Sequence, residues 1–211
     1  MTAATPAPAP ARAPRTRRGA ETRAALVAAA RTVFERDGFL DARIADVAAQ
    51  AGVATGSFYT HFADKEEILA AVLEAAREEM LHPHLSEQAD ELGPAAMIEA
   101  ANRAYLASYR KNAKLMALLD QVAAVDVRFR RLRAQRSRAF VARNARAIAR
   151  LQAQGLADPA LDPRQASRAL SGMVSRLAYA TYVLGERAPS ETLVQTLTRL
   201  WVNALRIPPQ R

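Results

Sequence analysis

Residues 52–65 read Gly-Val-Ala-Thr-Gly-Ser-Phe-Tyr-Thr-His-Phe-Ala-Asp-Lys, directly after a short apolar-periodic stretch at 43–51. Gly52 can adopt the left-handed conformation that a sharp turn between two helices needs. Phe58 and Phe62 are four residues apart and share one face of the second helix, whereas Tyr59 and Thr60 point outward. The stretch predicts two short helices, the second held from behind by two phenylalanines and carrying polar side chains suited to DNA.

Composition favours an all-α fold. Half of the 211 residues are apolar, alanine is abundant, and strand-like alternation of β-branched residues is nearly absent. The net charge of +9 and the pI of about 10.7 indicate an anionic partner, which composition leaves open between nucleic acid and an acidic membrane surface. Abundant arginine and alanine are also typical of a GC-rich genome, and in that case the charge carries less meaning.

The sequence argues against several classes of protein and site. There is no cysteine, so disulfides and thiolate metal sites are impossible, and no metal is expected at Glu78, His82 and His84 because Pro83 breaks the helix. No nucleophile lies beside a base and no glycine-rich phosphate loop is present, so we expect neither an enzyme nor a cofactor. The longest apolar run, 24–30, is too short for a bilayer, and no secretory signal is visible. A cytoplasmic protein without a membrane partner is expected.

Proline and glycine divide the chain into three parts. Residues 1–18 alternate alanine and proline and then add arginines, which predicts a disordered basic arm that either contacts DNA or is simply a solvated tail. Residues 19–64 predict a domain of three short helices, and residues 65–211 predict a larger helical domain. The whole chain should form about nine helices, because no strand or solenoid repeat interrupts the helical periodicity.

Capping residues mark the expected helix ends. The first helix should run from near Glu21 to Gly38, a stop signal, and Asp41 should cap the second. Asp64 and Glu67 resemble a capping box at the start of a fourth helix, which extends to about residue 81. Later helices are expected near 94–111, 114–124, 126–154, 163–185 and 190–206.

Residues 21–69 together resemble the N-terminal DNA-binding domain of the TetR (tetracycline repressor) family of bacterial regulators. The matching stretches are Ala29-Ala30, Val33-Phe34, Gly38-Phe39, Asp46-Val47-Ala48, Ala51-Gly52-Val53, Gly56-Ser57-Phe58-Tyr59, His61-Phe62 and Lys65-Glu66-Glu67-Ile68-Leu69. The resemblance implies a three-helix helix-turn-helix domain followed by a C-terminal helical domain for ligand binding and dimerisation.

The resemblance also assigns contacts with double-stranded DNA. It implies base-edge contacts from Thr55, Gly56, Ser57 and Thr60, and phosphate contacts from Tyr59, His61 and Lys65. Arg43 lies where the family commonly has a phosphate-contacting threonine, and an arginine there can reach backbone or base. Ala54 replaces a frequent serine, which moves the expected cap of this helix to Thr55, and Ala45 replaces a longer, often basic residue.

For the C-terminal domain the resemblance implies an effector cavity. Its expected lining is apolar or aromatic with a few polar groups: Met97, Tyr105, Tyr109, Met116, Leu119, Phe129, Arg136, Phe140, Asn144, Met173 and Leu177. Ordinary core packing is the competing interpretation for each. The expected effector is apolar or amphipathic, such as a lipid, an acyl thioester or a drug-like compound.

Arginines without acidic neighbours dominate residues 128–150, and most should form a solvated face. Arg136 is different, because it lies between Leu132 and Phe140 on the buried stripe. An unpaired buried guanidinium is costly, so Arg136 is the best candidate to meet a phosphate or carboxylate.

Helix-turn-helix proteins usually read DNA as dimers. By resemblance, the last two helices would form a homodimer interface through Met173, Leu177, Leu197 and Trp201, although part of these stripes could close the subunit's own core. The leading hypothesis is a sequence-specific transcriptional regulator that acts as a repressor rather than as an activator and is released from its operator by a small effector. The alternative is a basic architectural DNA-binding protein without strong sequence preference, against which the short polar side chains of 55–60 argue.

Overall fold

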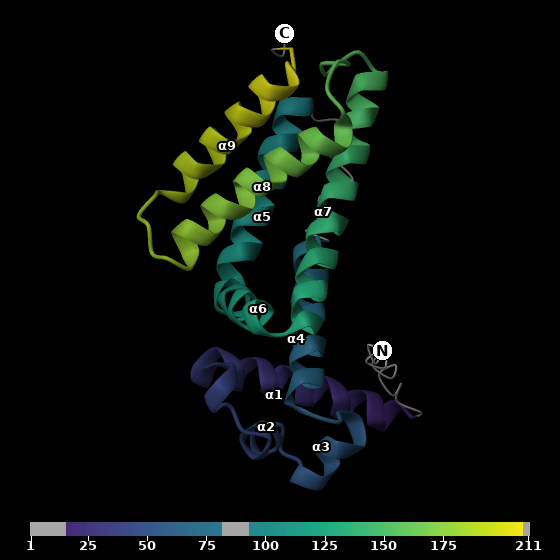
Figure 1. The fold of residues 1–211 in the computed structure, drawn as a ribbon, viewed down its shortest axis with the longest axis vertical. Helices are drawn as coiled ribbons and strands as arrows, with labels where there is room; N and C mark the ends of the chain where they lie inside the picture. Colours follow the sequence, from purple (N-terminus) through teal and green to yellow (C-terminus); the bar gives the residue numbers. More distant parts are fainter. Residues whose placement is uncertain (1–15, 82–92, 209–211) are drawn as a thin grey trace, which may run out of the picture. The chain divides into compact units, whose positions relative to one another are not determined.

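The computed structural model describes residues 16–81 and 93–208, and these residues contain helices and connecting turns but no strand. Residues group into two compact units, 1–74 and 75–211. The helices, coloured along the chain in Figure 1, are α1 (Arg17–Asp41), α2 (Ile44–Gln50), α3 (Thr55–His61), α4 (Lys65–Leu81), α5 (Pro94–Lys111), α6 (Ala113–Val125), α7 (Val127–Ala153), α8 (Pro163–Tyr182) and α9 (Ser190–Leu205). The all-α prediction is confirmed. The expected arm up to residue 15, and residues 82–84 with the two histidines, lie outside the described residues.

Helices α5 to α9 end within three residues of the predicted bounds, and side-chain caps fix the starts of α7 and α8. The Asp126 carboxylate accepts the Arg128 amide at 2.7 Å at the start of α7. At the start of α8, Asp162 accepts the Gln165 amide at 2.7 Å, and Pro163 occupies the first helical turn, where its missing amide costs nothing.

The ends of α1 differ from the prediction. The helix begins at Arg17 rather than near Glu21, because the Thr16 hydroxyl accepts the Gly19 amide at 3.1 Å and caps it. Gly38 interrupts it as expected, with φ of 75°, but helical turns resume up to Asp41. The predicted Asp41 cap of α2 is therefore wrong: the capping position belongs to Arg43, whose side chain makes no capping bond.

The turn between α2 and α3 follows the predicted glycine chemistry. Gly52 has φ of 69°, its amide donates to Ala49, and the Val53 amide donates to Ala48, both at 3.0 Å. This pair of bonds is a Schellman motif, which closes a helix only if one residue is left-handed. The cap of α3 is Ala54, not Thr55 as expected, because the backbone is already helical at Thr55.

The core of the first unit forms around α3. Phe58 and Phe62 are 0% and 1% exposed, and their rings lie 5.8 Å apart. They share this core with apolar residues from the neighbouring helices, namely Leu26, Ala30, Val33, Phe34, Val47, Ala48, Ile68 and Leu69. The predicted capping box also forms, since Asp64 accepts the Glu67 amide at 2.7 Å while the Glu67 carboxylate accepts the Ala63 amide.

Two helix pairs organise the second unit. Helix α7 packs against α8, where the Ser167 hydroxyl donates to the Val141 carbonyl at 2.9 Å. Helix α5 packs against α9, where the Asn102 amide donates to the Thr198 hydroxyl at 3.2 Å. None of the helices within residues 16–81 and 93–208 has the length and hydrophobicity needed to cross a bilayer.

A glycine pair tests the turn. A Cβ at Gly52 or at Gly56 would meet no atom within 4 Å, so the two positions differ in backbone conformation and not in space. Gly52→Ala should lower the protection of α2 and α3 amides by about 1–2 kcal/mol, because alanine is strained at positive φ. Gly56→Ala, in a helix, should leave it unchanged or slightly higher. Hydrogen–deuterium exchange of the full chain measures both, and equal effects would contradict the assigned turn.

Candidate nucleic-acid interface and internal cavity

Helix α3 presents its polar side to solvent. Thr55, Gly56, Tyr59 and Thr60 are exposed, Tyr59 by 56%, and Ser57 is half-buried. The Tyr59 ring rests edge-on against buried Phe58, with the ring centroids 5.4 Å apart, so its phenol is held while remaining accessible. The helix thus offers short hydroxyl side chains and one phenol on the same solvent-facing side.

His61 and Arg43 frame this surface. His61 is half-buried in the last turn of α3, and Arg43 is exposed immediately before α2, which packs against α3. All eight residues predicted to contact DNA belong to the first unit, and none of them is fully buried.

Lys65 has a structural role that the sequence did not reveal. Its ammonium donates to the carbonyls of Leu40 and Ala42, both at 3.0 Å, and lies 4.7 Å from the centre of the Phe39 ring. The lysine therefore ties the end of α1 to the start of α4. Its acceptors lie 25 and 23 residues earlier in the chain, a separation at which local sequence patterns carry no signal.

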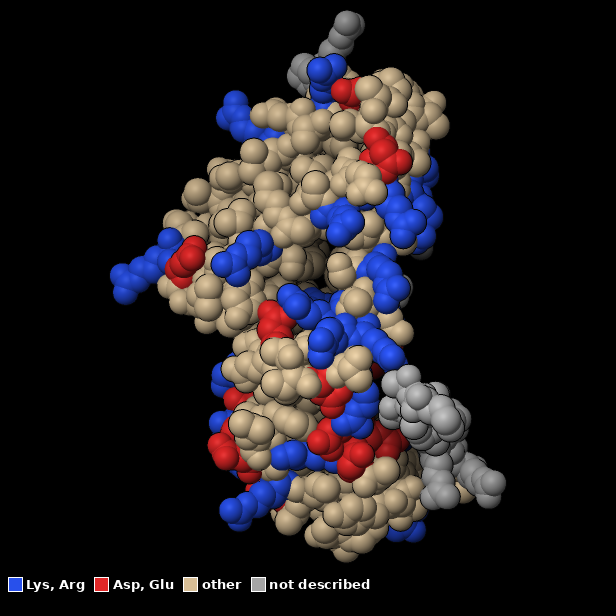
Figure 2. All heavy atoms as spheres, in the orientation of Figure 1, with Lys and Arg blue, Asp and Glu red and all other residues tan. Residues whose placement is uncertain are grey.

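Charge is divided unevenly between the units. Residues 1–74 contain nine basic and nine acidic side chains, whereas residues 75–211 contain twenty-one and twelve. The excess of nine positive charges belongs entirely to the second unit. Figure 2 shows lysine and arginine side chains gathered along α7 on the face it draws. Contacts from α3 to a polyanion would thus depend on individually placed groups rather than on the net charge of their unit.

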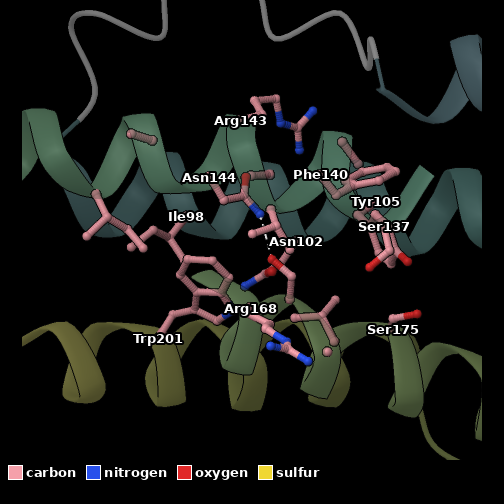
Figure 3. Close-up of a pocket in the computed structure, with 18 of the residues that line it drawn as sticks. Ile98, Asn102, Tyr105, Ser137, Phe140, Arg143, Asn144, Arg168, Ser175 and Trp201 are labelled. Carbon is pink, nitrogen blue, oxygen red and sulfur yellow. Dashed lines mark hydrogen bonds between the residues drawn. The ribbon is translucent and has the colours of Figure 1, made fainter. Parts of the chain in front are cut away.

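The second unit contains a partly open cavity of about 1600 Å³, bordered by α5, α7, α8 and α9 with part of α6 (Figure 3). The structure brings seven of the predicted residues to its wall: Met97, Tyr105, Tyr109, Met116, Arg136, Phe140 and Asn144. Leu119 and Phe129, each 3% exposed, are buried elsewhere in the packing of α6 and α7. Met173 and Leu177 are half-buried on α8 and do not reach it.

Several wall residues escaped the sequence-based prediction. Trp201, predicted at a dimer interface, is only 8% exposed within one chain and lines the cavity. Asn102 and Arg143 also line it. Helical spacing could have predicted both in the cavity wall, because Asn102 lies one turn before Tyr105 and Arg143 lies one turn after Phe140.

Two tyrosines remain proton donors in the cavity. Burial raises the pKa of Tyr105, and the positive charges of Arg136 and Arg143 oppose that shift. Burial likewise raises the pKa of Tyr109. Both phenols therefore keep their protons at neutral pH and can donate hydrogen bonds to a bound molecule.

Two family models match the chain. That of bacterial regulatory proteins of the tetR family matches residues 26–72, and that of the C-terminal domain of the transcriptional regulator EthR matches residues 98–206, just over half of the chain. ArpR of Pseudomonas putida, named as an HTH-type transcriptional regulator, is 42% identical over 77 residues, covering 35% of this chain. The matched stretch spans 36% of ArpR, about a third of its length.

Solved structures share the fold over most of the chain. A candidate TetR-family regulator from Rhodococcus sp. has a TM-score of 0.74 at 23% identity, covering 88% of this chain and 99% of the other. A candidate transcriptional regulator from Saccharomonospora viridis, in complex with choline, has a TM-score of 0.74 at 18% identity, covering 87% and 96%. At these identities the likeness concerns the fold.

Lys65 should matter for stability independently of any ligand. Lys65→Met removes a charged donor from two carbonyls and should lower the free energy of unfolding by about 1–3 kcal/mol. Lys114→Met, at an exposed lysine of α6, is the control and should change it little. Urea denaturation followed by circular dichroism compares the two variants. Equal stabilities would show that the ammonium does not join α1 to α4.

Proposed function

Because the chain belongs to the TetR family of bacterial transcriptional regulators, we propose that it is a homodimeric, sequence-specific DNA-binding protein. It acts as a repressor rather than as an activator, and a small effector releases it from its operator. The observation that carries this proposal is the exposed polar side of α3 above two buried phenylalanines. A seven-residue helix is too short to be stable alone, so its orientation is set by that burial.

In this proposal α3 enters the major groove. Thr55, Ser57 and Thr60 offer short hydroxyls that can reach base edges, while Gly56 lets the backbone approach closely, since no atom lies within 4 Å of the place of a Cβ. Phosphates would be held by groups around this helix: Tyr59, His61, Arg43 and the start of α4 at Lys65. Lys65 can donate its remaining N–H to a phosphate without giving up its two carbonyls.

Two copies of the chain would pair through α8 and α9. Helix-turn-helix dimers bind half-sites separated by about 34–36 Å or a multiple of it, which requires a fixed partner. Leu197 and Trp201 are buried within one subunit, so the proposed interface uses the other side of these helices, with Leu200 42% exposed and Met173 and Leu177 half-buried.

The cavity is the proposed effector site. Its volume accommodates a drug-sized molecule, and its wall mixes aromatic, aliphatic and a few polar groups, as ligand sites usually do. The Saccharomonospora viridis regulator of the same fold was solved with choline, which agrees with a small-molecule response. An effector shifts the regulator away from DNA only by binding the released state more tightly.

In the architectural alternative, the arginine-rich α7 of the second unit would bind DNA without sequence preference through its net positive charge. That alternative gives no role to the exposed hydroxyl side chains of α3. Competition between a duplex selected from a random pool and random duplex decides between the two functions. A preference of about a thousandfold or more is expected, and no preference would favour the architectural protein.

Contacts to phosphate and to bases should respond differently to mutation. Tyr59→Phe removes one hydroxyl and should weaken binding to selected and random duplexes alike, by about three- to tenfold. Thr60→Val should instead change which bases are selected. Fluorescence anisotropy and repeated selection measure these effects, with Thr32→Ala on α1 as control. A changed base preference in Tyr59→Phe, with general affinity intact, would overturn the assigned roles.

Dimer formation should depend on the exposed side of α9. Leu200→Glu places a charge in the proposed interface and should shift the chain towards the monomer, weakening operator binding with it. Leu40→Glu, at a residue of the first unit that is 88% exposed, is the matched control and should remain dimeric. Sedimentation velocity at micromolar concentration compares them, and an unchanged dimer in Leu200→Glu would exclude this face.

A further inference from the structure

The most unusual group in the cavity wall is the guanidinium of Arg136. It forms no ion pair with any carboxylate of the described residues, and its Nε is buried without a hydrogen-bond partner. Its two terminal nitrogens contact only the sulfur atoms of Met116 and Met80, which are weak acceptors. A cation so poorly compensated by the protein costs stability unless something else pairs with it.

A second cation approaches the same place. The guanidinium carbons of Arg136 and Arg143 lie 5.8 Å and 5.2 Å from the centre of the Phe140 ring. That ring meets Tyr105 edge-on at 5.4 Å, and both arginines influence the Tyr105 hydroxyl electrostatically. The two like charges lie two turns apart on α7 and face the same ring, so an anion between them would offset their repulsion and accept from the Arg136 Nε.

Arginines line the whole wall, and Arg136 differs from the others by its buried nitrogen without a hydrogen-bond partner. Figure 3 shows Phe140, Tyr105 and Ser137 gathered at one end, and Ile98 with Trp201 towards the other. Among the described residues, the two buried side-chain nitrogens or oxygens without a partner are Arg136 Nε and Trp201 Nε1, and both residues line this cavity. The end at Phe140 holds the unpartnered Nε of Arg136, whereas the end at Ile98 and Trp201 offers apolar surface and an indole N–H, with Arg168 nearby (Figure 3).

Asp120 is the one acidic residue of the wall, against eight arginines. It is already paired, since its carboxylate accepts from Arg133 at 2.8 Å. Arg103 is likewise paired with Glu99 and Glu191 on the surface of α5 and α9. The wall thus contains no spare carboxylate for Arg136.

We propose that the cavity binds an anionic amphiphile, whose carboxylate or phosphate is held by Arg136 with Arg143 and the Tyr105 hydroxyl, and whose apolar body extends towards Trp201. This rests on the proposed function in one respect, namely that the same cavity is the effector site. A neutral analogue leaves the guanidinium unpaired, and a cationic analogue adds repulsion, so both are selected against.

Trp201 is the only tryptophan of the chain, so its fluorescence reports on this cavity without an added dye. The full chain would be titrated with four probes that share a twelve-carbon body: dodecanoate, dodecyl phosphate, dodecanol and dodecyltrimethylammonium. Both anions should change the Trp201 emission and bind at least about tenfold more tightly than dodecanol, and the cation should bind most weakly. Comparison of the two anions tells whether the site prefers a carboxylate or a phosphate.

Variants of α7 test the role of Arg136. Arg136→Gln should weaken both anions by about ten- to hundredfold and leave dodecanol unaffected. Arg138→Gln, an exposed arginine of the same helix that does not line the cavity, should bind all probes as the wild type does. Arg136→Met should raise the melting temperature of the ligand-free chain, because a half-buried charge that no carboxylate compensates is removed. A merely structural arginine would give a lower melting temperature and equal losses for all probes.

Equal affinity for dodecanoate and dodecanol, or unchanged anion binding in Arg136→Gln, would overturn the anion site. Operator binding, measured separately with saturating dodecanoate, tests the proposed function. Arg136-dependent anion binding with an unaltered operator affinity would keep the anion site and refute its role as the effector site. Operator release by dodecanol but not by dodecanoate would keep the proposed function and refute the anion site.

Discussion

Burial of Phe58 and Phe62 determines which side of α3 faces solvent. The two residues are four apart, so they occupy one face, and their removal from water fixes the rotation of a helix that could not hold its shape alone. The left-handed Gly52 then sets where that helix starts. The Asp64 and Glu67 capping box begins α4 directly after it. Every proposed DNA contact depends on this arrangement, since it leaves Tyr59 and Thr60 outside.

The second unit differs from the first in how its polar groups are paired. In the first unit Lys65 donates to two carbonyls, whereas in the second the Arg136 Nε and the Trp201 indole N–H are buried without hydrogen-bond partners beside a large cavity. Polar groups of this kind reduce the stability of the empty chain and add to the affinity of a molecule that satisfies them. α4 carries residues of both units, and its Met80 contacts Arg136.

Much of the fold could be predicted from the sequence, because it depends on local signals. Helical periodicity, the Asp64 and Glu67 capping box and the Gly52 turn placed the elements. The errors also have local causes: Asp41 is a good capping residue in composition, yet the chain is still helical there. The cavity was harder to predict. Residue type predicts Met116 and Phe140 in the cavity wall, but it places Trp201 at the dimer interface, because an apolar stripe does not reveal which partner covers it. The acceptors of Lys65 could not be predicted either, because they lie 25 and 23 residues away in the chain.

Whether α3 is the surface that meets DNA can be measured directly by hydroxyl-radical footprinting of the full chain, with and without a duplex selected from a random pool. The exposed Tyr59 should be oxidised readily in the free protein and become protected in the complex, while arginine-rich α7 peptides keep their oxidation pattern. Protection confined to α7, with Tyr59 still oxidised at its free rate, would contradict DNA reading by α3.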